Sequence, residues 1–320
     1  MRIALLNNLR AGRSDEKVSQ LLGFLRQHRD VIHVETDSAY AVPEALADLA
    51  RQEVDVLAVN GGDGTLQHAL TEILGSHAFG DSVPMIAPLR GGRTNMTALD
   101  LGTQSDPVRS MARLIEASEN GELESYMRPR KVIRVEYGPG RQVEYGMFLG
   151  VGVIHRAIEL THRVFPRGRS QGVLGSTLVT AALISRAALL RDTDGVLSPD
   201  KVQVMLDGKL LDQGEFMLSI ASTLGRLFSR MRPFWGTEPG NLRFSFVTPK
   251  PYKPLRAVVP ILRGRAGDVV REENGYVSRN VDRADLRFDC GFTVDGELFT
   301  PEPGRIATVT ADRGVRFLAL

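Results

Sequence analysis

The clearest chemical signal in this sequence is the run at residues 61–65, which reads Gly-Gly-Asp-Gly-Thr. An apolar stretch at 54–59 precedes it, and a helical pattern begins at Leu66. Glycines at a strand-to-helix turn allow positive φ angles and let a ligand approach the backbone closely. The helix start offers free N–H groups and a positive dipole end, which suit phosphate. Asp63 adds a carboxylate that makes sense beside a metal ion or a ligand hydroxyl or amine. The run therefore predicts a nucleotide site.

The elements that would position this run alternate between strand and helix. Short apolar strands are predicted at 3–6, 31–34, 54–59 and 84–87, with helices between them and another helix at 107–120. This alternation favours a parallel sheet covered on both faces. Ligands of such sheets bind beyond the carboxyl ends of the strands. Asn8, Thr36, Asp63 and the loop at 91–95 each follow a predicted strand, so we expect them to meet at one edge of the sheet.

The pattern changes after about residue 125, where short strands with turn residues between them dominate. These strands are predicted at 132–137, 143–151, 201–206, 216–222, 242–247, 257–261, 277–281, 284–288 and 291–294, with one helical stretch at about 172–191. They favour an antiparallel sandwich. We therefore predict an α/β N-terminal domain at 1–125 with a parallel sheet, followed by a mostly antiparallel β-sandwich domain at 126–320. The last ~15 residues are candidates to return to the first domain.

The run at 61–65 resembles the Gly-Gly-Asp-Gly-Thr signature of the diacylglycerol kinase catalytic-domain family, which includes sphingosine and ceramide kinases. NAD kinases and phosphofructokinases share a related motif. The loop at 91–95 resembles the family's Gly-Gly-Thr-x-Asn loop, although Arg93 stands where threonine is usual and Met96 where aspartate is frequent. Asn8 with Gly12 resembles the family's Asn-Pro-x-x-Gly loop, and residues 148–152 resemble a glycine-bearing strand of its second domain. The resemblance covers almost the whole chain in the right order and implies a fold like that of NAD kinases and diacylglycerol kinases.

The resemblance implies an ATP- and Mg²⁺-dependent lipid kinase. The residues implied to bind the nucleotide are Asn8, Thr36, Gly61, Gly62, Asp63, Gly64, Thr65, Gly91, Gly92, Thr94 and Asn95. Asp63 is also implied in catalysis, as a ligand of the Mg²⁺ that accompanies ATP. Thr94 can supply the hydroxyl that Arg93 displaces, and Arg93 can contact phosphate through its guanidinium group.

Asp295, Gly296 and Glu297 match an Asp-Gly-Glu motif that is linked to catalysis in the same family. An Asp-Gly pair is also a common hairpin turn, so a structural interpretation stands beside the catalytic one. Phosphoryl transfer to an alcohol needs a group that accepts the hydroxyl proton. Asp295 and Glu297 are both candidates for that base, and two carboxylates at this spacing can share a site in which one pKa is raised.

Two alternatives remain open. An NAD kinase shares the first motif, and residues 175–177, Gly-Ser-Thr, resemble its second motif faintly. A catalytically weak nucleotide- or lipid-binding protein would explain Arg93 and Met96. The family's Asp-Asp-Gly segment, associated with a structural Mg²⁺, is also altered, because Glu238 is the carboxylate left between 233 and 240. That second metal site is therefore not expected to form.

Composition points to an ordinary globular protein, with 42% apolar and 24% charged residues. No stretch approaches the roughly 18 apolar residues of a membrane span, no signal peptide is apparent, and the single cysteine fits a reducing compartment. Residues 1–128 carry 12 basic against 18 acidic residues, whereas residues 129–320 carry 28 against 20. The basic second half suits an anionic partner. We expect a cytoplasmic protein without a nucleic-acid partner, and a homodimer stays an open alternative.

The segment at 226–235 combines arginines with aromatic residues, a composition that suits a membrane interface. The residues expected to contact lipid are Arg226, Phe228, Arg230, Arg232, Phe234 and Trp235. A loop packed on the core is the alternative. The lipid-contact interpretation predicts transient docking on an anionic membrane surface, with a lipid as substrate and the protein peripherally membrane-associated.

Overall fold

The structure, a computed structural model, describes residues 1–10, 15–38, 41–76, 78–80, 82–138, 140, 142–164, 198–211 and 214–320. Gly12, the predicted helix at 172–191 and the run at 175–177 lie outside these residues. The chain divides into two compact units: Met1–Lys131 together with Gly314–Leu320, and Val132–Arg313. The second unit is thus an insertion between two parts of the first.

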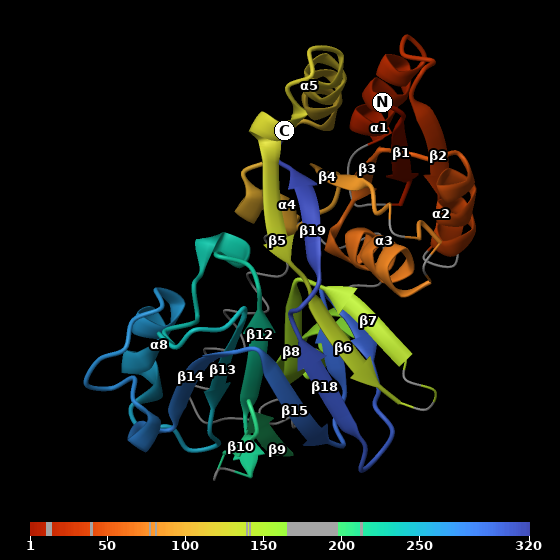
Figure 1. Ribbon diagram of the computed structural model, residues 1–320. Helices are drawn as coiled ribbons and strands as arrows, with labels where there is room; N and C mark the ends of the chain where they lie inside the picture. The colour runs from red at the N-terminus through yellow and green to blue at the C-terminus, as the bar shows by residue number, and fades with distance from the viewer. Residues whose placement is uncertain are drawn as a thin grey trace. The chain divides into compact units, whose positions relative to one another are not determined.

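The first unit is built on one sheet whose strand order is β2-β1-β3-β4-β19-β5 (Figure 1). Its strands are β1 (Ile3–Asn8), β2 (Ile32–Thr36), β3 (Val56–Gly61), β4 (Met85–Arg90), β5 (Met127–Lys131) and β19 (Gly314–Leu318). Its helices are α1 (Asp15–Leu25), α2 (Val42–Arg51), α3 (Asp63–Gly75), α4 (Met96–Leu101), α5 (Pro107–Glu119) and the short 3-10 helix η2 (Leu123–Tyr126). Every pair from β2 to β19 is parallel, and only β5 runs antiparallel to its neighbour β19.

Helices cover both faces of this sheet because its central strands are apolar on both sides. Leu5 of β1 and Ala58 of β3 pack on one face with Leu21 of α1 and Met111 of α5. On the other side α2 and α3 contact each other and the neighbouring strands. Figure 1 shows α1 and α5 together at one side of the sheet and α2 and α3 at the other.

The second unit consists of two sheets, with strand orders β10-β9-β15-β18-β6-β7 and β14-β13-β12-β8-β16-β17, and with β11 paired to β9. The first sheet contains β6 (Ile133–Tyr137), β7 (Gln142–Gly146), β9 (Asp200–Leu206), β10 (Lys209–Leu210), β11 (Glu215–Phe216), β15 (Arg283–Phe288) and β18 (Ile306–Thr310). The second contains β8 (Phe148–Gly152), β12 (Leu218–Ser222), β13 (Leu242–Val247), β14 (Tyr276–Val281), β16 (Phe292–Val294) and β17 (Glu297–Phe299). The helical elements of this unit are α6 (Val153–Val164), η3 (Phe228–Arg230), α8 (Pro254–Leu262) and η4 (Glu272–Asn274).

The two sheets share one apolar core. It joins residues of the first sheet, such as Val135 and Leu286, to residues of the second, such as Leu149 and Phe244. Phe292 is fully buried in this core, and its ring lies edge-on to that of Tyr137 with 4.9 Å between the ring centroids. Inward-facing side chains of two antiparallel sheets that meet in this way define a sandwich.

The fold class predicted from the sequence is confirmed: an α/β unit with a mostly parallel sheet and a mostly antiparallel sandwich. The strand predicted at 257–261 is wrong, because these residues belong to helix α8. Val258, Val259 and Ile261 are β-branched and favour a strand by type. However, Pro254 stands in the first turn of α8, where its fixed φ favours a helix start, and Pro260 could not donate to a sheet ladder.

We predict that Phe292→Ala lowers the free energy of unfolding by about 3–5 kcal/mol, because it leaves a large cavity between the two sheets. Leu210→Ala is the control, since Leu210 is 65% exposed and removal of its side chain should change stability by no more than about 0.5 kcal/mol. Urea denaturation followed by circular dichroism measures both. Equal losses for the two variants would contradict the described core.

Candidate functional site

The predicted site residues of the first unit lie at the carboxyl ends of adjacent parallel strands. Asn8 at the end of β1 pairs in register with Thr36 at the end of β2, and Gly61 at the end of β3 pairs with Arg90 at the end of β4. The Asn8 side-chain amide donates a hydrogen bond of 2.8 Å to the Thr65 hydroxyl in the first turn of α3. The sheet thus brings together residues that lie far apart in the sequence.

Two glycine-rich loops touch each other at this edge. A side-chain carbon added to Gly92 would overlap the Cα of Gly62, and one added to Gly91 would overlap Asn60 and the backbone of Gly61. The loops at 61–65 and 91–95 can approach this closely only because Gly91 and Gly92 carry no side chain at the contact. Glycine is therefore required here for loop packing, independently of any ligand.

Asp63 holds the two loops together. Its carboxylate oxygens accept hydrogen bonds from the backbone N–H groups of Met96 and Thr97, at 2.9 and 3.1 Å. These N–H groups belong to the first turn of α4, where no backbone partner within the helix exists for them. Burial raises the pKa of the Asp63 carboxyl, and the hydrogen bonds from Met96 and Thr97 oppose that rise. Asp63 therefore has a structural task in addition to any role towards a ligand.

Asn95 closes the second loop on itself. Its side-chain oxygen accepts from the Gly92 N–H at 2.8 Å, and its side-chain amide donates to the Gly92 carbonyl at 2.7 Å. Its backbone is left-handed, with φ 50°, which asparagine tolerates better than most residues. The two hydrogen bonds between Asn95 and Gly92 close a ring, and Arg93 and Thr94, both partly exposed, lie at its tip. The substitution at Arg93 leaves the ring around it intact.

The polar side chain of Asn60 and its neighbours behind the loops were not predicted from the sequence. Asn60 donates at 2.8 Å to Asn7, whose side chain also lies 3.4 Å from a ring nitrogen of His33. Within the described part of the chain, the Asn60 side-chain oxygen and the Thr36 hydroxyl are buried without a hydrogen-bond partner. Buried polar atoms are nearly always paired, so unpaired ones at a strand end point to a ligand. An asparagine inside an otherwise apolar strand was the signal that could have revealed Asn60.

These features fit a nucleotide. The loops provide close backbone approach, the thirteen-residue helix α3 presents its N-terminus, and Thr36 and Asn60 offer unused polar atoms. A cage made by protein carboxylates alone does not fit, since no three His, Cys, Asp or Glu side chains come together among the described residues. Mg²⁺ does not need such a cage, because it commonly binds through one or two carboxylates and the phosphates of the substrate. Asp63 would be such a carboxylate.

The Asp-Gly-Glu motif of the second unit forms a tight hairpin between β16 and β17. Asp295 and Gly296 both have positive φ, 49° and 96°, as a two-residue type I′ turn requires. The Asp295 carboxylate is buried and accepts the backbone N–H groups of Met147 and Phe148, each at 2.9 Å. Asp295 therefore ties this hairpin to the start of β8.

Glu297 differs from Asp295 in its surroundings. Glu297 is partly exposed, whereas Asp295 is buried. Glu238, the carboxylate of the altered metal segment, is exposed, and its Oε1 lies 3.4 Å from Nε of Arg279. Burial raises its pKa, but backbone hydrogen bonds and Arg279 outweigh this and lower it. Glu238 is thus held by an arginine in this structure.

The segment at 226–235 mixes exposed and packed side chains. Arg226, Arg230 and Arg232 are exposed, whereas Phe228 and Phe234 are partly buried. Trp235 packs against a small apolar cluster around Val247, Ala257, Val270 and Tyr276, here called the α8 cluster, which also includes Met217, Leu218, Ile261 and Val269. The indole is therefore part of the packing of the second unit.

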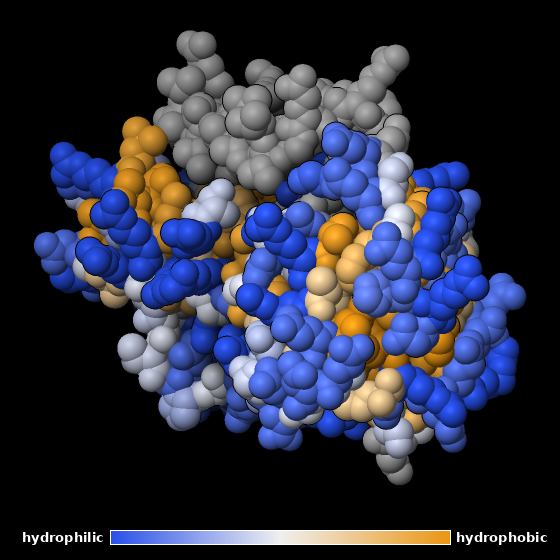
Figure 2. All heavy atoms as spheres, turned by 90° about the horizontal axis from the view of Figure 1, so that it is seen from above, coloured by the Kyte–Doolittle hydropathy of each residue, from blue (hydrophilic) through white to orange (hydrophobic). Residues whose placement is uncertain are grey.

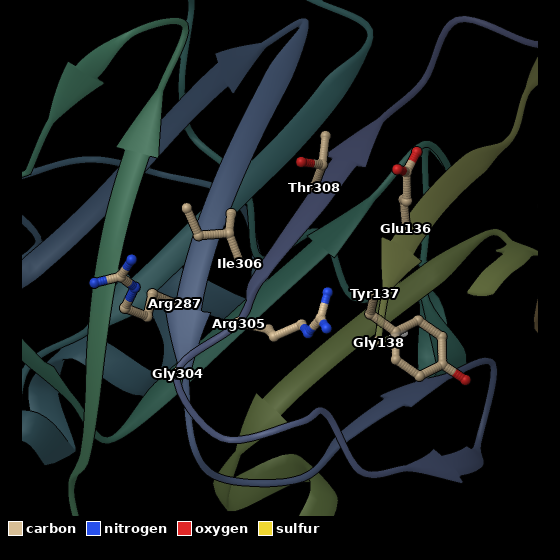
Figure 3. Close-up of a pocket in the computed structure, with 8 residues that line it drawn as sticks. All are labelled: Glu136, Tyr137, Gly138, Arg287, Gly304, Arg305, Ile306 and Thr308. Atoms are coloured by element: carbon tan, nitrogen blue, oxygen red, sulfur yellow. The ribbon is translucent and has the colours of Figure 1, made fainter. Parts of the chain in front are cut away.

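A cavity of about 480 Å³ lies on the first sheet of the second unit (Figure 3). Its lining comes from β6, β15, β18 and the segments next to them, and includes none of the residues predicted to carry chemistry. Glu136 in its wall pairs with Arg134 at 2.7 Å, and Arg305 pairs with Glu302. Two of its charged groups are thus already paired within the protein.

Residues 2–122 match the diacylglycerol kinase catalytic domain family, which confirms the resemblance that the motifs predicted. No curated protein matches the chain. Among solved structures, a diacylglycerol kinase from Bacillus anthracis is similar at 16% identity with a TM-score of 0.64, over 100% of this chain and 97% of that one. Two proposed diacylglycerol kinases from the same organism have TM-scores of 0.66 and 0.68 at 15% and 14% identity, over 100% of this chain and 95% and 97% of theirs. At these identities the likeness shows a shared fold.

Among the residues that the structure describes, no helix is both long and apolar enough to cross a bilayer.

Replacing Gly92 by alanine tests the loop contact. The added methyl group would overlap Gly62, so we expect a loss of about 1–3 kcal/mol in stability and a clear weakening of ATP binding. Gly23→Ala on α1 is the matched control, because nothing lies within 4 Å of the added carbon there and alanine favours a helix. Thermal unfolding and titration with ATP measure both effects. Unchanged ATP binding by the Gly92 variant would contradict the site.

The pH dependence of stability tests the buried network. Burial lowers the pKa of His33 from its ordinary value of 6.5, and Glu35 opposes this shift in part. The unfolded chain therefore binds a proton more readily than the folded chain, so the unfolding free energy should fall as the pH falls through 6.5. The variant His33→Gln should show a flatter profile over this range. Identical slopes for the two proteins, from urea denaturation above and below pH 6.5, would rule the prediction out.

Proposed function

We propose that this protein is a lipid kinase that transfers the γ-phosphoryl group of ATP to the hydroxyl of a lipid alcohol. The observation that carries the proposal is the pair of glycine loops stapled by Asp63, in a stretch that matches the diacylglycerol kinase catalytic domain. A diacylglycerol, a ceramide or a sphingoid base is the substrate class that this match favours. The matched family is one of kinases, and the lipid acceptor, ATP and Mg²⁺ are our proposal for this chain.

The first unit would bind the nucleotide. The backbone of the loops at 61–65 and 91–95 would face the phosphates, with the N-terminus of α3 favouring their negative charge. Asn60 and Thr36 would use their unpaired polar atoms on the nucleotide. Asp63, Asn95 and the glycines would keep the loops in place, so that little reorganisation accompanies the reaction. Mg²⁺, when bound through Asp63 and the phosphates, would neutralise phosphate charge.

The second unit would supply the base. The lipid oxygen forms a bond to the γ-phosphorus, the bond between that phosphorus and the oxygen of ADP breaks, and the hydroxyl proton passes to a carboxylate. Asp295 and Glu297 are the candidates. Both oxygens of Asp295 already accept backbone hydrogen bonds, which fixes its position, whereas Glu297 is partly exposed.

A kinase assay on a total lipid extract tests the function. We expect the protein to transfer label from ATP to a lipid in the presence of Mg²⁺, and Asp63→Asn to lower the rate by at least about 10²-fold. Replacing the base should lower the rate of phosphoryl transfer by about 10²- to 10⁴-fold. The base is therefore identified by whichever of Asp295→Asn and Glu297→Gln causes this loss. Asp295→Asn should also lower stability by about 1–3 kcal/mol, because one buried N–H loses its acceptor.

Glu215→Gln is the matched control, since Glu215 is an exposed carboxylate on β11 and should leave the rate unchanged. Denaturation curves for every variant separate a chemical effect from partial unfolding. Formation of NADP from NAD and ATP would replace the proposal by an NAD kinase. ATP binding without phosphorylation of any lipid, beside an active lipid kinase as positive control, would leave a nucleotide-binding protein instead.

A further inference from the structure

The outer side of helix α8 carries apolar side chains that the protein leaves in solvent. The residues Leu255, Val259 and Tyr252 are 61%, 52% and 49% exposed. Leu255 and Val259 are four residues apart and therefore lie on one side of the helix, whereas Tyr252 lies in the segment just before it. Ala257 and Ile261 occupy the opposite side and pack into the α8 cluster. The helix is therefore apolar on both sides, although only one of them contacts the protein among the described residues.

Cations surround this apolar side. Residues 249–265 contain five basic residues and no acidic residue, and all five are exposed: Lys250, Lys253, Arg256, Arg263 and Arg265. None of them forms an ion pair with any residue described in the structure. At the left of Figure 2, the side on which α8 lies in Figure 1, hydrophobic side chains border directly on hydrophilic ones. Charge of one sign next to exposed apolar residues suits an anionic lipid surface.

A depression at the start of α8 joins the two features. It has a volume of about 700 Å³ and is lined by three prolines and Leu255, together with Lys250, Lys253 and Arg256. The Lys253 ammonium lies 4.6 Å from the centroid of the Tyr252 ring. An apolar floor with cations around it matches a phospholipid, whose phosphate is anionic and whose chains are apolar.

The arginine segment at 226–235 continues this surface. The Arg232 N–H donates at 2.9 Å to the carbonyl of Leu262, the last residue of α8. Arg232 therefore contacts the end of the helix through its backbone, and both Arg232 and the nearby Arg230 are exposed. Trp235 lies in the α8 cluster together with Ile261, on the side of α8 that faces the protein. Tyr252, which is exposed, is then the aromatic residue available to a lipid surface, while Trp235 packs on the inner side of the helix.

The helix is held firmly enough to act as a docking element. Tyr252 donates its N–H to the Asn274 carbonyl at 2.9 Å, and its own carbonyl accepts the Tyr276 hydroxyl at 2.9 Å. These bonds fix Tyr252, two residues before α8 begins, and the α8 cluster fixes the inner side of the helix. A helix that is anchored in this way can bury its outer side without paying the ordering entropy of a flexible segment.

We propose that α8, with its flanking cations, is the surface by which this protein docks on an anionic phospholipid bilayer. The outer side of α8 would enter the interface between head groups and chains, while Lys253, Arg256 and Arg263 contact lipid phosphates. The identity of the surface rests on the proposed lipid kinase function, because such an enzyme meets its substrate in a membrane. The apolar side and its cations do not depend on that function.

Vesicle co-sedimentation of the full chain tests the proposal. The probes are vesicles of phosphatidylcholine alone and of phosphatidylcholine mixed with phosphatidylglycerol. We expect binding to the mixed vesicles that weakens as salt is added. Replacing Lys253, Arg256 and Arg263 by glutamine should lower the partition constant roughly a hundredfold. Leu255→Ser with Val259→Ser should abolish most of the binding that survives at high salt.

The matched control is Lys209→Gln with Leu210→Ser, which removes an exposed cation and an exposed leucine from β10 in the same unit. It should bind like the wild type. The chain has a single tryptophan, Trp235, which packs on the inner side of α8, so unchanged fluorescence of the free variants shows that the helix keeps its packing. Thermal unfolding shows whether each variant is folded.

Three results would overturn the proposal: no preference of the wild type for anionic vesicles, equal binding by the α8 variants, or equal loss in the control. Sedimentation velocity adds a fourth. If the wild type self-associates and the Leu255 and Val259 variant does not, the apolar side is an interface between copies of the chain. Vesicle binding is measured without ATP and with Asp63→Asn alongside, so a failed kinase assay and a failed docking experiment remain distinguishable.

Discussion

The candidate site of the first unit depends on the two hydrogen bonds that the Asp63 carboxylate accepts. Its two carboxylate oxygens hold the first two N–H groups of α4 and thereby fix the loop at 91–95 against the turn at 61–65. Hydrogen bonds to a charged group are worth about 1.5–3 kcal/mol each, enough to offset part of the cost of burying a carboxylate. The same two loops also meet closely at Gly62 and Gly92. Strand ends, loops and helix starts are thus arranged around one side chain.

The second unit repeats the device. Asp295 also accepts two successive backbone N–H groups, those of Met147 and Phe148, and also sits in a turn with a glycine beside it. In both motifs an aspartate that sequence comparison would assign to chemistry also organises the backbone around it. Loss of activity on replacing either residue is therefore ambiguous until stability is measured, and the partly exposed Glu297 offers the cleaner chemical substitution.

The sequence was sufficient to predict those features of the fold and the site that depend on the local pattern of residues. The apolar strand before Gly61 and the helical periodicity after it predicted the turn, and the alternation of strands and helices predicted the parallel sheet. It was insufficient where hydrogen-bond partners lie far apart in the sequence, or where residue composition favours the wrong secondary structure. No local sequence pattern indicates the hydrogen bond between Asp63 and the Met96 N–H. The hydrogen-bonded loop closed by Asn95 and Gly92 depends on a left-handed backbone at Asn95. Helix α8 was mistaken for a strand because it is β-branched and apolar on both sides, the same property that makes its outer side notable.

The course of the chain through the first sheet has a consequence for biosynthesis. β19 lies between β4 and β5, so a strand from the end of the chain separates two strands made much earlier. The carbonyl of Leu320 also accepts the Gln104 N–H at 2.6 Å. During translation the first unit must wait, with the edges of β4 and β5 unpaired, until the whole second unit has left the ribosome. An unpaired strand edge invites wrong partners. The first unit therefore begins to form before the second unit is made and is completed only after it.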